Sequence, residues 1–380
     1  MLWLLGLSIG WAFAGPTYAP RVVEEAAFTM FGGGVSHDPV VVDGVAYLSS
    51  YDGLSAIAMT DGALIWFADG TGKSFLRPVV LDRLVITAEW TSNSEDPKRG
   101  TVHAFDRATG AEVWATRLNA WMDPAGAGDD LAILARTGDE YALVVLDASD
   151  GRERVRLDVA DAGYAQPVVA AGLVLLATDR SGLTAYDADD GHVVWTTGSR
   201  GIAMSVPTCA GKRVFHTDSD GEKGVVRARD LETGDIVWTC PFDAPVSGRF
   251  VVDGSRGYTF DWAGDVWAID VERGEILWHT RMPHGGTRSV AVGDGVVFVP
   301  GFASVRFGTD DERKRGQLQA VSAVTGERQR VSQIFDHERI TTPAVESGRV
   351  LVGSAAGDGY WIAWDVDAFL LEPQAHSSAK

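Results

Sequence analysis

The stretch Ala104-Phe-Asp106-Arg-Ala-Thr-Gly110-Ala-Glu-Val-Trp114 recurs, with small changes, along the 380-residue chain. Its Asp-x-x-Thr-Gly core is typical of a tight turn, because glycine adopts positive φ without steric cost and aspartate bonds to nearby backbone amides. The residues on either side are rich in β-branched and aromatic types, which favours a strand before and after the turn. The same Ala, Gly and Trp spacing returns in four more copies, which end at Trp66, Trp195, Trp238 and Trp278.

The repeat has a nearly constant length. Its glycines, including those of the degenerate copies at Gly151 and Gly326, are separated by 40 to 52 residues, with a mean of about 44. Residues 39–67 show one complete unit, in which four short apolar runs are joined by Asp-Gly-type turns. Four-stranded units of this length are typical of a β-propeller. Eight units begin near Pro39, Pro78, Asp123, Pro167, Ser205, Gly248, Ser289 and Pro343.

The predicted fold is therefore all-β: an eight-bladed β-propeller of four-stranded antiparallel blades. The eighth unit stops after Asp365 without its outer strand. We expect residues 26–31 to supply that strand, so that an N-terminal strand closes the ring and removes a free sheet edge. The alternative is that residues 368–371 supply it. The predicted layout is a signal peptide at 1–14, an N-terminal segment at 15–37, the propeller at 38–367 and a C-terminal tail at 368–380.

Residues 1–14 have the character of a secretory leader. They are apolar and uncharged, they are too short to span a bilayer, and Ala12-Phe13-Ala14 before Gly15 resembles a cleavage site. A buried N-terminal segment is the alternative. There is no cysteine near this point for a lipid anchor, and no later stretch has the length of a transmembrane segment. The expected location is periplasmic or secreted.

Composition excludes several classes of protein. The net charge of −19 and the pI of about 4.7 argue against nucleic acid and against anionic membrane surfaces as partners. With 46% hydrophobic and 22% charged residues, the chain is ordinary for a globular protein and not a disordered one. Cys209 and Cys240 fall near opposite faces of the propeller, roughly 15 Å apart, so we expect no disulfide between them.

The Ala-x-Asp-x-x-Thr-Gly-x-x-x-Trp pattern resembles the tryptophan-docking motif of the quinoprotein, or PQQ-type, eight-bladed propellers. The resemblance covers about residues 38–367. Among members with a single propeller, the chain is most similar to the BamB family, the propeller subunits of the outer-membrane β-barrel assembly machinery, although it lacks their lipobox cysteine. The resemblance implies a structural role, packing between neighbouring blades, for Trp66, Trp114, Trp195, Trp238 and Trp278.

Loop length points to one face of the propeller as the binding face. If the strands are lettered A to D from the axis outward, the D–A and B–C loops share a face, and the long loops at 89–100 and 301–316 are both B–C loops. Exposed aromatic and arginine side chains favour interfaces. The candidate partner-binding residues are Trp90, Arg99, Phe302, Arg306 and Phe307; the alternative is that these are solvent loops. The tryptophans Trp90, Trp121, Trp262 and Trp361 are expected on or near the same face.

The axial funnel is the second candidate site. Residues that enter the inner strands are expected to line it, and the ligand candidates are His37, Asp38, Arg77, Gln166 and Arg288, with Asp123 beside them. A quinone cofactor with three carboxylates would need several cationic side chains here and a Ca²⁺ held by carboxylate or amide oxygens. No catalytic residue is assigned by motif, the histidines lack metal-ligand spacing, and we expect neither a metal nor a cofactor.

Three functions remain at this point. The first is a non-enzymatic periplasmic or secreted scaffold that binds another envelope protein, in outer-membrane protein assembly or envelope maintenance. The second is a PQQ- and Ca²⁺-dependent dehydrogenase, and the third is a carbohydrate- or surface-binding module.

Overall fold

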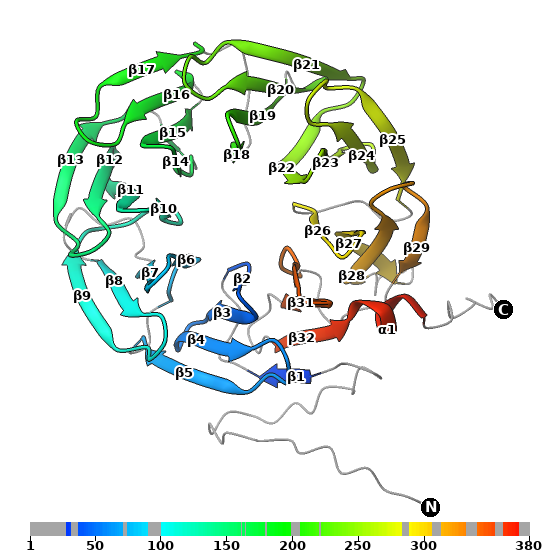
Figure 1. Cartoon of the computed structure of the whole chain (residues 1–380), viewed down its shortest axis with the longest axis horizontal. Coiled ribbons are helices and arrows are strands. Elements are labelled where there is room, and N and C mark those ends of the chain that lie inside the picture. Colours follow the sequence, from blue (N-terminus) through cyan, green and yellow to red (C-terminus); the bar gives the residue numbers. More distant parts are fainter. Residues whose placement is uncertain are drawn as a thin grey trace, which may run out of the picture.

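A computed structural model describes residues 28–31, 37–70, 74–89, 100–160, 162–163, 165–178, 181–198, 206–219, 222–282, 289–305, 313–331, 340–353 and 360–371. They form eight four-stranded antiparallel sheets arranged around a central axis (Figure 1). The predicted eight-bladed propeller is therefore confirmed. None of the helical residues in these ranges forms a segment long and apolar enough to cross a membrane.

Each blade contributes one strand to each of four concentric positions, A nearest the axis and D outermost. Blades one to four are β2 (Val40–Val42), β3 (Val45–Ser49), β4 (Gly53–Ala58) and β5 (Leu64–Asp69); β6 (Val79–Val80), β7 (Leu84–Ala88), β8 (Thr101–Asp106) and β9 (Glu112–Arg117); β10 (Ala125–Ala127), β11 (Asp130–Thr137), β12 (Glu140–Asp147) and β13 (Glu153–Asp158); and β14 (Val168–Ala170), β15 (Leu173–Thr178), β16 (Gly182–Asp187) and β17 (Val193–Thr196).

The second half of the ring repeats this order. Blades five to eight are β18 (Thr208–Ala210), β19 (Arg213–Ser219), β20 (Gly224–Asp230) and β21 (Ile236–Phe242); β22 (Val246–Asp253), β23 (Arg256–Asp261), β24 (Asp265–Asp270) and β25 (Ile276–Arg281); β26 (Ala291–Gly293), β27 (Val296–Val305), β28 (Arg313–Ser322) and β29 (Arg328–Val331); and β30 (Ala344–Glu346), β31 (Arg349–Gly353), β32 (Tyr360–Asp365) and β1 (Phe28–Phe31).

The core lies between blades, in the B and C strands. Ile86 in β7 and Leu131 in β11 are completely buried and share one apolar cluster that spans blades two and three. The D strands alternate between exposed and buried side chains, as Leu64–Asp69 does, because only one of their faces meets a neighbouring blade. Burial of both faces of the inner strands therefore joins the blades into one ring.

The repeated tryptophans join neighbouring blades as expected. The indole N–H of each donates to a backbone carbonyl in the C–D turn of the next blade, and the turn glycine lies on the ring so closely that a Cβ there would come within 2.5 or 2.6 Å of it. The hydrogen bonds are Trp66 to Arg107 (2.9 Å), Trp114 to Ala148 (2.9 Å), Trp195 to Leu231 (3.0 Å), Trp238 to Val271 (2.9 Å) and Trp278 to Ala323 (3.2 Å). The motif is thus a contact between blades.

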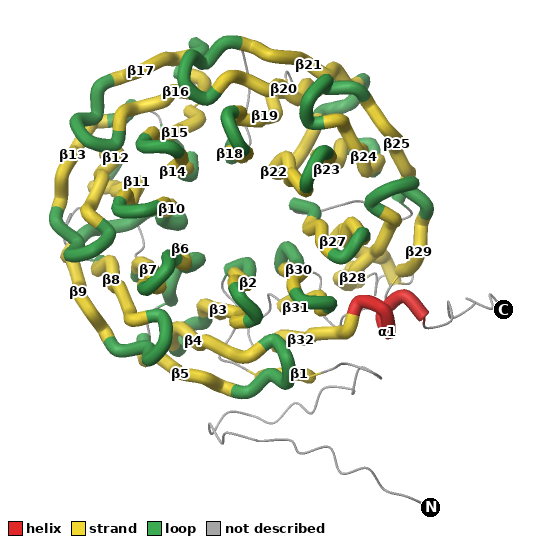
Figure 2. Tube along the Cα trace, in the orientation of Figure 1, coloured by secondary structure: helices red, strands yellow, loops and turns green. Residues whose placement is uncertain are grey.

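The N-terminal strand closes the ring. β1 pairs antiparallel with β32, in a register that sets Phe28 opposite Ala363 and Phe31 opposite Tyr360. The alternative strand at 368–371 does not form, because these residues belong to helix α1 (Val366–Leu371), the red helix of Figure 2. Phe369 of α1 is only 2% exposed and packs in the core of blades seven and eight, so the helix spans the boundary placed at 367/368.

Three of the eight blades have a residue other than tryptophan at the docking position; in blade eight it is Phe28, opposite Ala363. In blade three Val155 takes this position and lies under Gly191 of the next turn, where a Cβ would come within 2.5 Å. In blade seven the position is Arg330, whose guanidinium lies 4.6 Å from the ring centroid of Phe369. Cys209 in β18 and Cys240 in β21 occupy the first and fourth strands of one sheet and are both free thiols, in agreement with the expected absence of a disulfide.

Candidate binding site at the axial mouth

One side chain from every blade stands at the same position, two residues before the start of the regular A–B pairing, which in blade six is Val251, after the bulge in β22. The register is identical around the ring, since Val40 pairs with Tyr47, Val79 with Ile86 and Val251 with Tyr258. Because A strands start on the D–A face, these side chains surround one mouth of the axial channel. The eight residues are Asp38, Arg77, Asp123, Gln166, Val206, Arg249, Ser289 and Thr342, and we call them the mouth ring.

A pocket of about 270 Å³ opens among the mouth ring residues. Its lining includes Arg77, Asp123, Gln166 and Arg249, each from a different blade, together with the prolines and valines that begin the A strands. In Figure 1 these strands, β6, β10, β14 and β22, border the centre of the ring. The volume lies just below the range of pockets that hold drug-sized molecules, so a small ligand or one group of a larger ligand would fill it.

The carboxylates at the mouth already have partners. Asp123 accepts hydrogen bonds from the backbone N–H of Arg77 at 3.0 Å and from the Gln166 amide at 3.2 Å, and His37 Nδ1 lies 3.3 Å from its Oδ1. Asp38 accepts from the backbone N–H of Thr342 at 2.8 Å. These bonds tie blades one, two, three, four and eight together, so the acids have a positioning role.

The side chains of the mouth arginines, unlike those of the acids, have no hydrogen-bond partner among the described residues. Among the described residues, no hydrogen bond or ion pair engages the guanidinium of Arg77 or Arg249, and Nε of Arg77 is buried without a partner. The pKa of Arg249 is lowered to about 10, mainly by burial and also by the charge of Arg77, while Asp123 and Asp38 offset part of the shift. The two side chains come from blades two and six, which face each other across the ring (Figure 1).

Four of the five funnel residues predicted from the sequence lie together. His37, Asp38, Arg77 and Gln166 all contribute to the mouth, and Asp123 links three of them. Arg288 lies outside the described residues, and the mouth ring position of its blade is Ser289. Arg249 was missed because blade six has no proline there and carries a bulge between Ser247 and Val251. Alignment on the paired A-strand residues, rather than on proline, would have found it.

Most of the predicted partner-binding residues cannot be placed. Trp90, Arg99, Arg306 and Phe307 lie outside the described residues, and only the backbone of Phe302 is described, in β27 opposite Gly316. The hairpin of blade seven, which includes Phe302, is nevertheless long: β27 and β28 pair over ten residues each, as far as Val305 and Arg313. This hairpin extends from the D–A face beyond the shorter B strands of the other blades.

The second-longest B strand, β11 of blade three, has eight residues and lies across the ring from blade seven (Figure 1). Near the tip of its hairpin, Arg136 stacks between two aromatic rings, with its guanidinium carbon 4.2 Å from the Trp121 centroid and 5.3 Å from that of Tyr141. The Trp121 indole donates to Gly163 O at 2.8 Å. Two extended hairpins therefore flank the mouth ring.

The remaining tryptophans divide between surface and core. Trp262, in the B–C turn of blade six, is 72% exposed. Trp361 lies at the B–C end of β32, opposite Gly353, but is only 3% exposed: it packs in an apolar cluster with Leu48 and Leu351, between blades one and eight, and belongs to the core.

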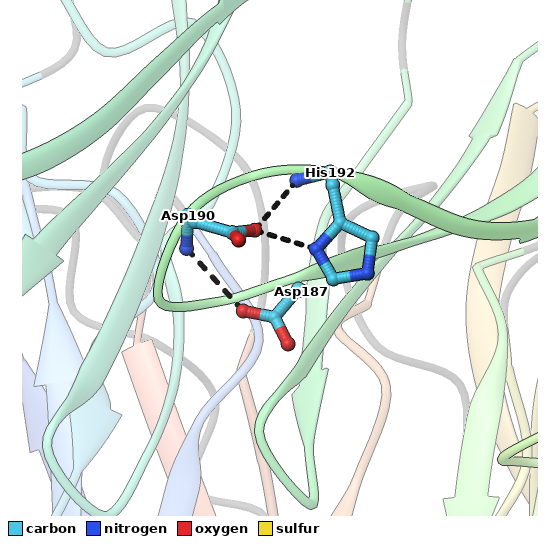
Figure 3. Close-up of side chains that lie close together, drawn as sticks. All are labelled: Asp187, Asp190 and His192. Carbon is cyan, nitrogen blue, oxygen red and sulfur yellow. Dashed lines mark hydrogen bonds and ion pairs between the residues drawn. The ribbon is translucent and has the colours of Figure 1, made fainter.

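One group of potential metal ligands lies away from the mouth, in the C–D turn of blade four (Figure 3). His192 Nδ1 is 2.6 Å from Asp190 Oδ1, and Asp187 Oδ1 accepts from the backbone N–H groups of Asp189 and Asp190. The same aspartate-to-amide bonds build the turn at Asp230, where the N–H groups of Glu232 and Thr233 lie 2.9 Å from its Oδ1. The cluster in Figure 3 is therefore explained as turn structure.

The comparison with known families agrees with the blades and the docking contacts. The family profile of outer membrane protein assembly factor BamB matches residues 98–222 and 222–367. The chain belongs to the BamB family. The BamB of Yersinia pestis is 26% identical over 334 residues, which cover 81% of this chain and 79% of that protein. The BamB of Burkholderia pseudomallei is 24% identical, over 74% of this chain and 73% of its own length.

Two solved structures show the same fold. The computationally designed Ika8 protein has a TM-score of 0.69 at 13% identity, with 90% of this chain and 99% of that chain covered. BamB from Moraxella catarrhalis has a TM-score of 0.54 at 18% identity, with 80% and 96% covered. A tetrathionate hydrolase of Acidithiobacillus ferrooxidans is also similar in sequence, 23% identical over 77% of this chain and 67% of its own length.

A quinone cofactor with calcium does not match the donor set of the described mouth. Two guanidiniums are available to carboxylates, but Asp123 is already engaged by three groups and Asp38 by Thr342, so few oxygens remain for a calcium ion that takes six to eight. Of the two arginines in the cofactor hypothesis, the structure places Arg77 at the pocket and adds Arg249, whereas Arg288 lies outside the described residues.

Proposed function

We propose that the chain is a non-enzymatic periplasmic or secreted scaffold that binds a component of outer-membrane protein assembly through its D–A face. The observation that carries the proposal is the β27–β28 hairpin, which extends from that face on a chain of the BamB family. Several relatives are named as outer membrane protein assembly factors and match over most of their length, which supports a role in outer-membrane protein assembly. A closed ring that carries an extended hairpin on one face suits the presentation of a binding surface.

The test is site-specific photo-crosslinking in cells. Phe302 is replaced by p-benzoylphenylalanine in one chain, and Lys212, an exposed residue in an A–B turn on the opposite face, is replaced in a matched control. We expect a defined crosslink to an outer-membrane assembly protein from position 302 and none from position 212. Equal crosslinking from both positions, or none from position 302, contradicts the proposal.

A second variant tests whether the hairpin itself is needed. Residues 303–315 are replaced by Asn-Gly, which joins Phe302 to its cross-strand partner Gly316 through a two-residue turn. The blade keeps its inner strands, so we expect an unchanged circular dichroism spectrum and loss of co-purification of the partner. A shortened chain that still co-purifies the same partner assigns the binding to another part of the molecule.

A further inference from the structure

The mouth ring contains two guanidinium groups that no carboxylate of the ring pairs with among the described residues. Each guanidinium can donate five N–H bonds in a planar fork that fits a carboxylate. The acids nearby are used by the Arg77 backbone, Gln166, His37 and Thr342. Two arginines thus reach one pocket with their charged ends unengaged by the described residues, although buried polar groups normally have partners.

The positions of the two arginines restrict the span and the charge of a ligand that could contact both. They stand in opposite blades and line the same pocket, so a ligand between them would contact both sides of the channel mouth. An anion there would relieve the repulsion between Arg77 and Arg249, which contributes to the lowered pKa of Arg249. Asp38 and Asp123 act on Arg249 from the same mouth. Their negative charges disfavour two charges concentrated on one phosphate group more than two single charges on separate carboxylates.

We infer that Arg77 and Arg249 form a binding site for a ligand with two carboxylates, one held by each guanidinium. The chemistry is shared by a free small dicarboxylic acid and by the C-terminal residue of a peptide that ends in Asp or Glu. The pocket volume of about 270 Å³ fits either source. The site is independent of the scaffold function, because it uses the channel mouth and not the hairpin of blade seven.

The test measures the melting temperature and the affinity of the full chain. Succinate, glutarate and adipate are titrated against sodium chloride of equal ionic strength, with acetate and phosphate as further probes. A ligand that binds only the folded state raises the melting temperature in a saturable way. We expect this with at least one dicarboxylate, a smaller effect of acetate and phosphate, and none from chloride. An equal shift with chloride at the same ionic strength overturns the inference.

Variants assign the effect to the arginines. Arg77→Gln and Arg249→Gln should each weaken dicarboxylate binding about tenfold or more, since each removes a charge-assisted bidentate contact. Arg273→Gln, in an exposed C–D turn on the other face, is the matched control and should bind as the wild type does. If a glutamine variant does not fold, Arg77→Lys and Arg249→Lys keep the charge and should still lose the bidentate contact. Unchanged affinity in the folded variants of both arginines rejects the site.

Two further arms identify the source of the carboxylates and separate this inference from the scaffold function. A peptide ending in Glu is compared with its C-terminally amidated form, and a difference lost in Arg249→Gln supports a peptide ligand. PQQ, a tricarboxylate, is also titrated in the presence of Ca²⁺. If the wild type binds PQQ and both Arg77→Gln and Arg249→Gln lose this binding, the result supports the arginine site and contradicts a non-enzymatic function. If no anion binds while the position 302 crosslink persists, this inference fails and the scaffold function stands.

Discussion

At the scale of single residues, the docking tryptophans join neighbouring blades through both a hydrogen bond and close packing. Trp238 is 8% exposed, donates to Val271 O at 2.9 Å, and lies under Gly274, where a Cβ would come within 2.6 Å of the indole. Trp238→Ala removes this hydrogen bond and leaves a cavity between blades five and six. We expect it to lower the free energy of unfolding by about 3–5 kcal/mol, measured by urea denaturation.

Trp262→Ala is the matched control, because that side chain is 72% exposed. Its free energy of unfolding should stay within about 0.5 kcal/mol of the wild type. Similar losses in both variants would show that tryptophan itself, and not its place between blades, determines the effect.

At the scale of elements, ring closure depends on the pairing of β1 with β32. Proline lacks the N–H that a ladder hydrogen bond needs, and the N–H groups of adjacent strand residues point to opposite sides. β1 is an edge strand that pairs only with β32, so Thr29→Pro with Met30→Pro removes whichever of the two N–H groups faces β32. That lost hydrogen bond costs about 1 kcal/mol, and where β1 detaches the outer edge of β32 becomes unpaired. We expect a lower melting temperature and concentration-dependent association in analytical ultracentrifugation.

The double variant Thr29→Ala with Met30→Ala keeps both N–H groups and should stay monodisperse if the wild type is. Association of the alanine variant to the same extent would assign the effect to the lost side chains and not to the open edge.

At the scale of the whole molecule, two opposing effects set how stability changes with pH. The net charge of −19 decreases in magnitude as the pH falls toward the pI, which relieves self-repulsion in the folded chain. Buried His216 lowers stability over the same change in pH. Burial lowers the pKa of His216 to about 3, and its Nε2 accepts from Arg229 Nε at 3.0 Å, so the folded chain holds it neutral. The unfolded chain takes up a proton near pH 6.5. The contribution of His216 to stability is therefore complete above pH 6.5 and is lost as the pH falls from there toward 3.

His216→Gln isolates this contribution. The stability difference between wild type and variant should shrink between pH 6.5 and 4.5, with a slope of up to about 1.4 kcal/mol per pH unit, measured by urea denaturation. The control His192→Gln should show the opposite sign, because Asp190 raises the pKa of exposed His192 and its contribution is present at low pH. Parallel pH profiles of the wild type and His216→Gln would contradict the assignment.

Much of the propeller could be predicted from the sequence, whereas the site could be predicted only in part. The turn at Asp106–Gly110 and the tryptophan that follows are local features, and repetition alone gives eight blades. Asp38, Arg77 and Gln166 were found because a proline marks the start of their A strands. Arg249 was missed where the strand carries a bulge and no proline, and the burial of Trp361 was missed because strand alternation does not reveal that both faces of β32 are covered.

By itself, the sequence determined the blade number and the positions of the repeated tryptophans, because turn chemistry and hydrophobic periodicity act over a few residues and repeat. It left the closing strand between residues 26–31 and 368–371, and the pairing of β1 with β32 decided it. Only the tertiary structure decided that Arg77 and Arg249 line one pocket, since the curvature of the ring brings blades two and six to face each other across the axis. It also decided that, among the described residues, Asp123 is engaged by three groups while the two guanidiniums are not engaged, which depends on contacts between blades. Charge pairing across a closed ring is set by geometry that no single repeat contains.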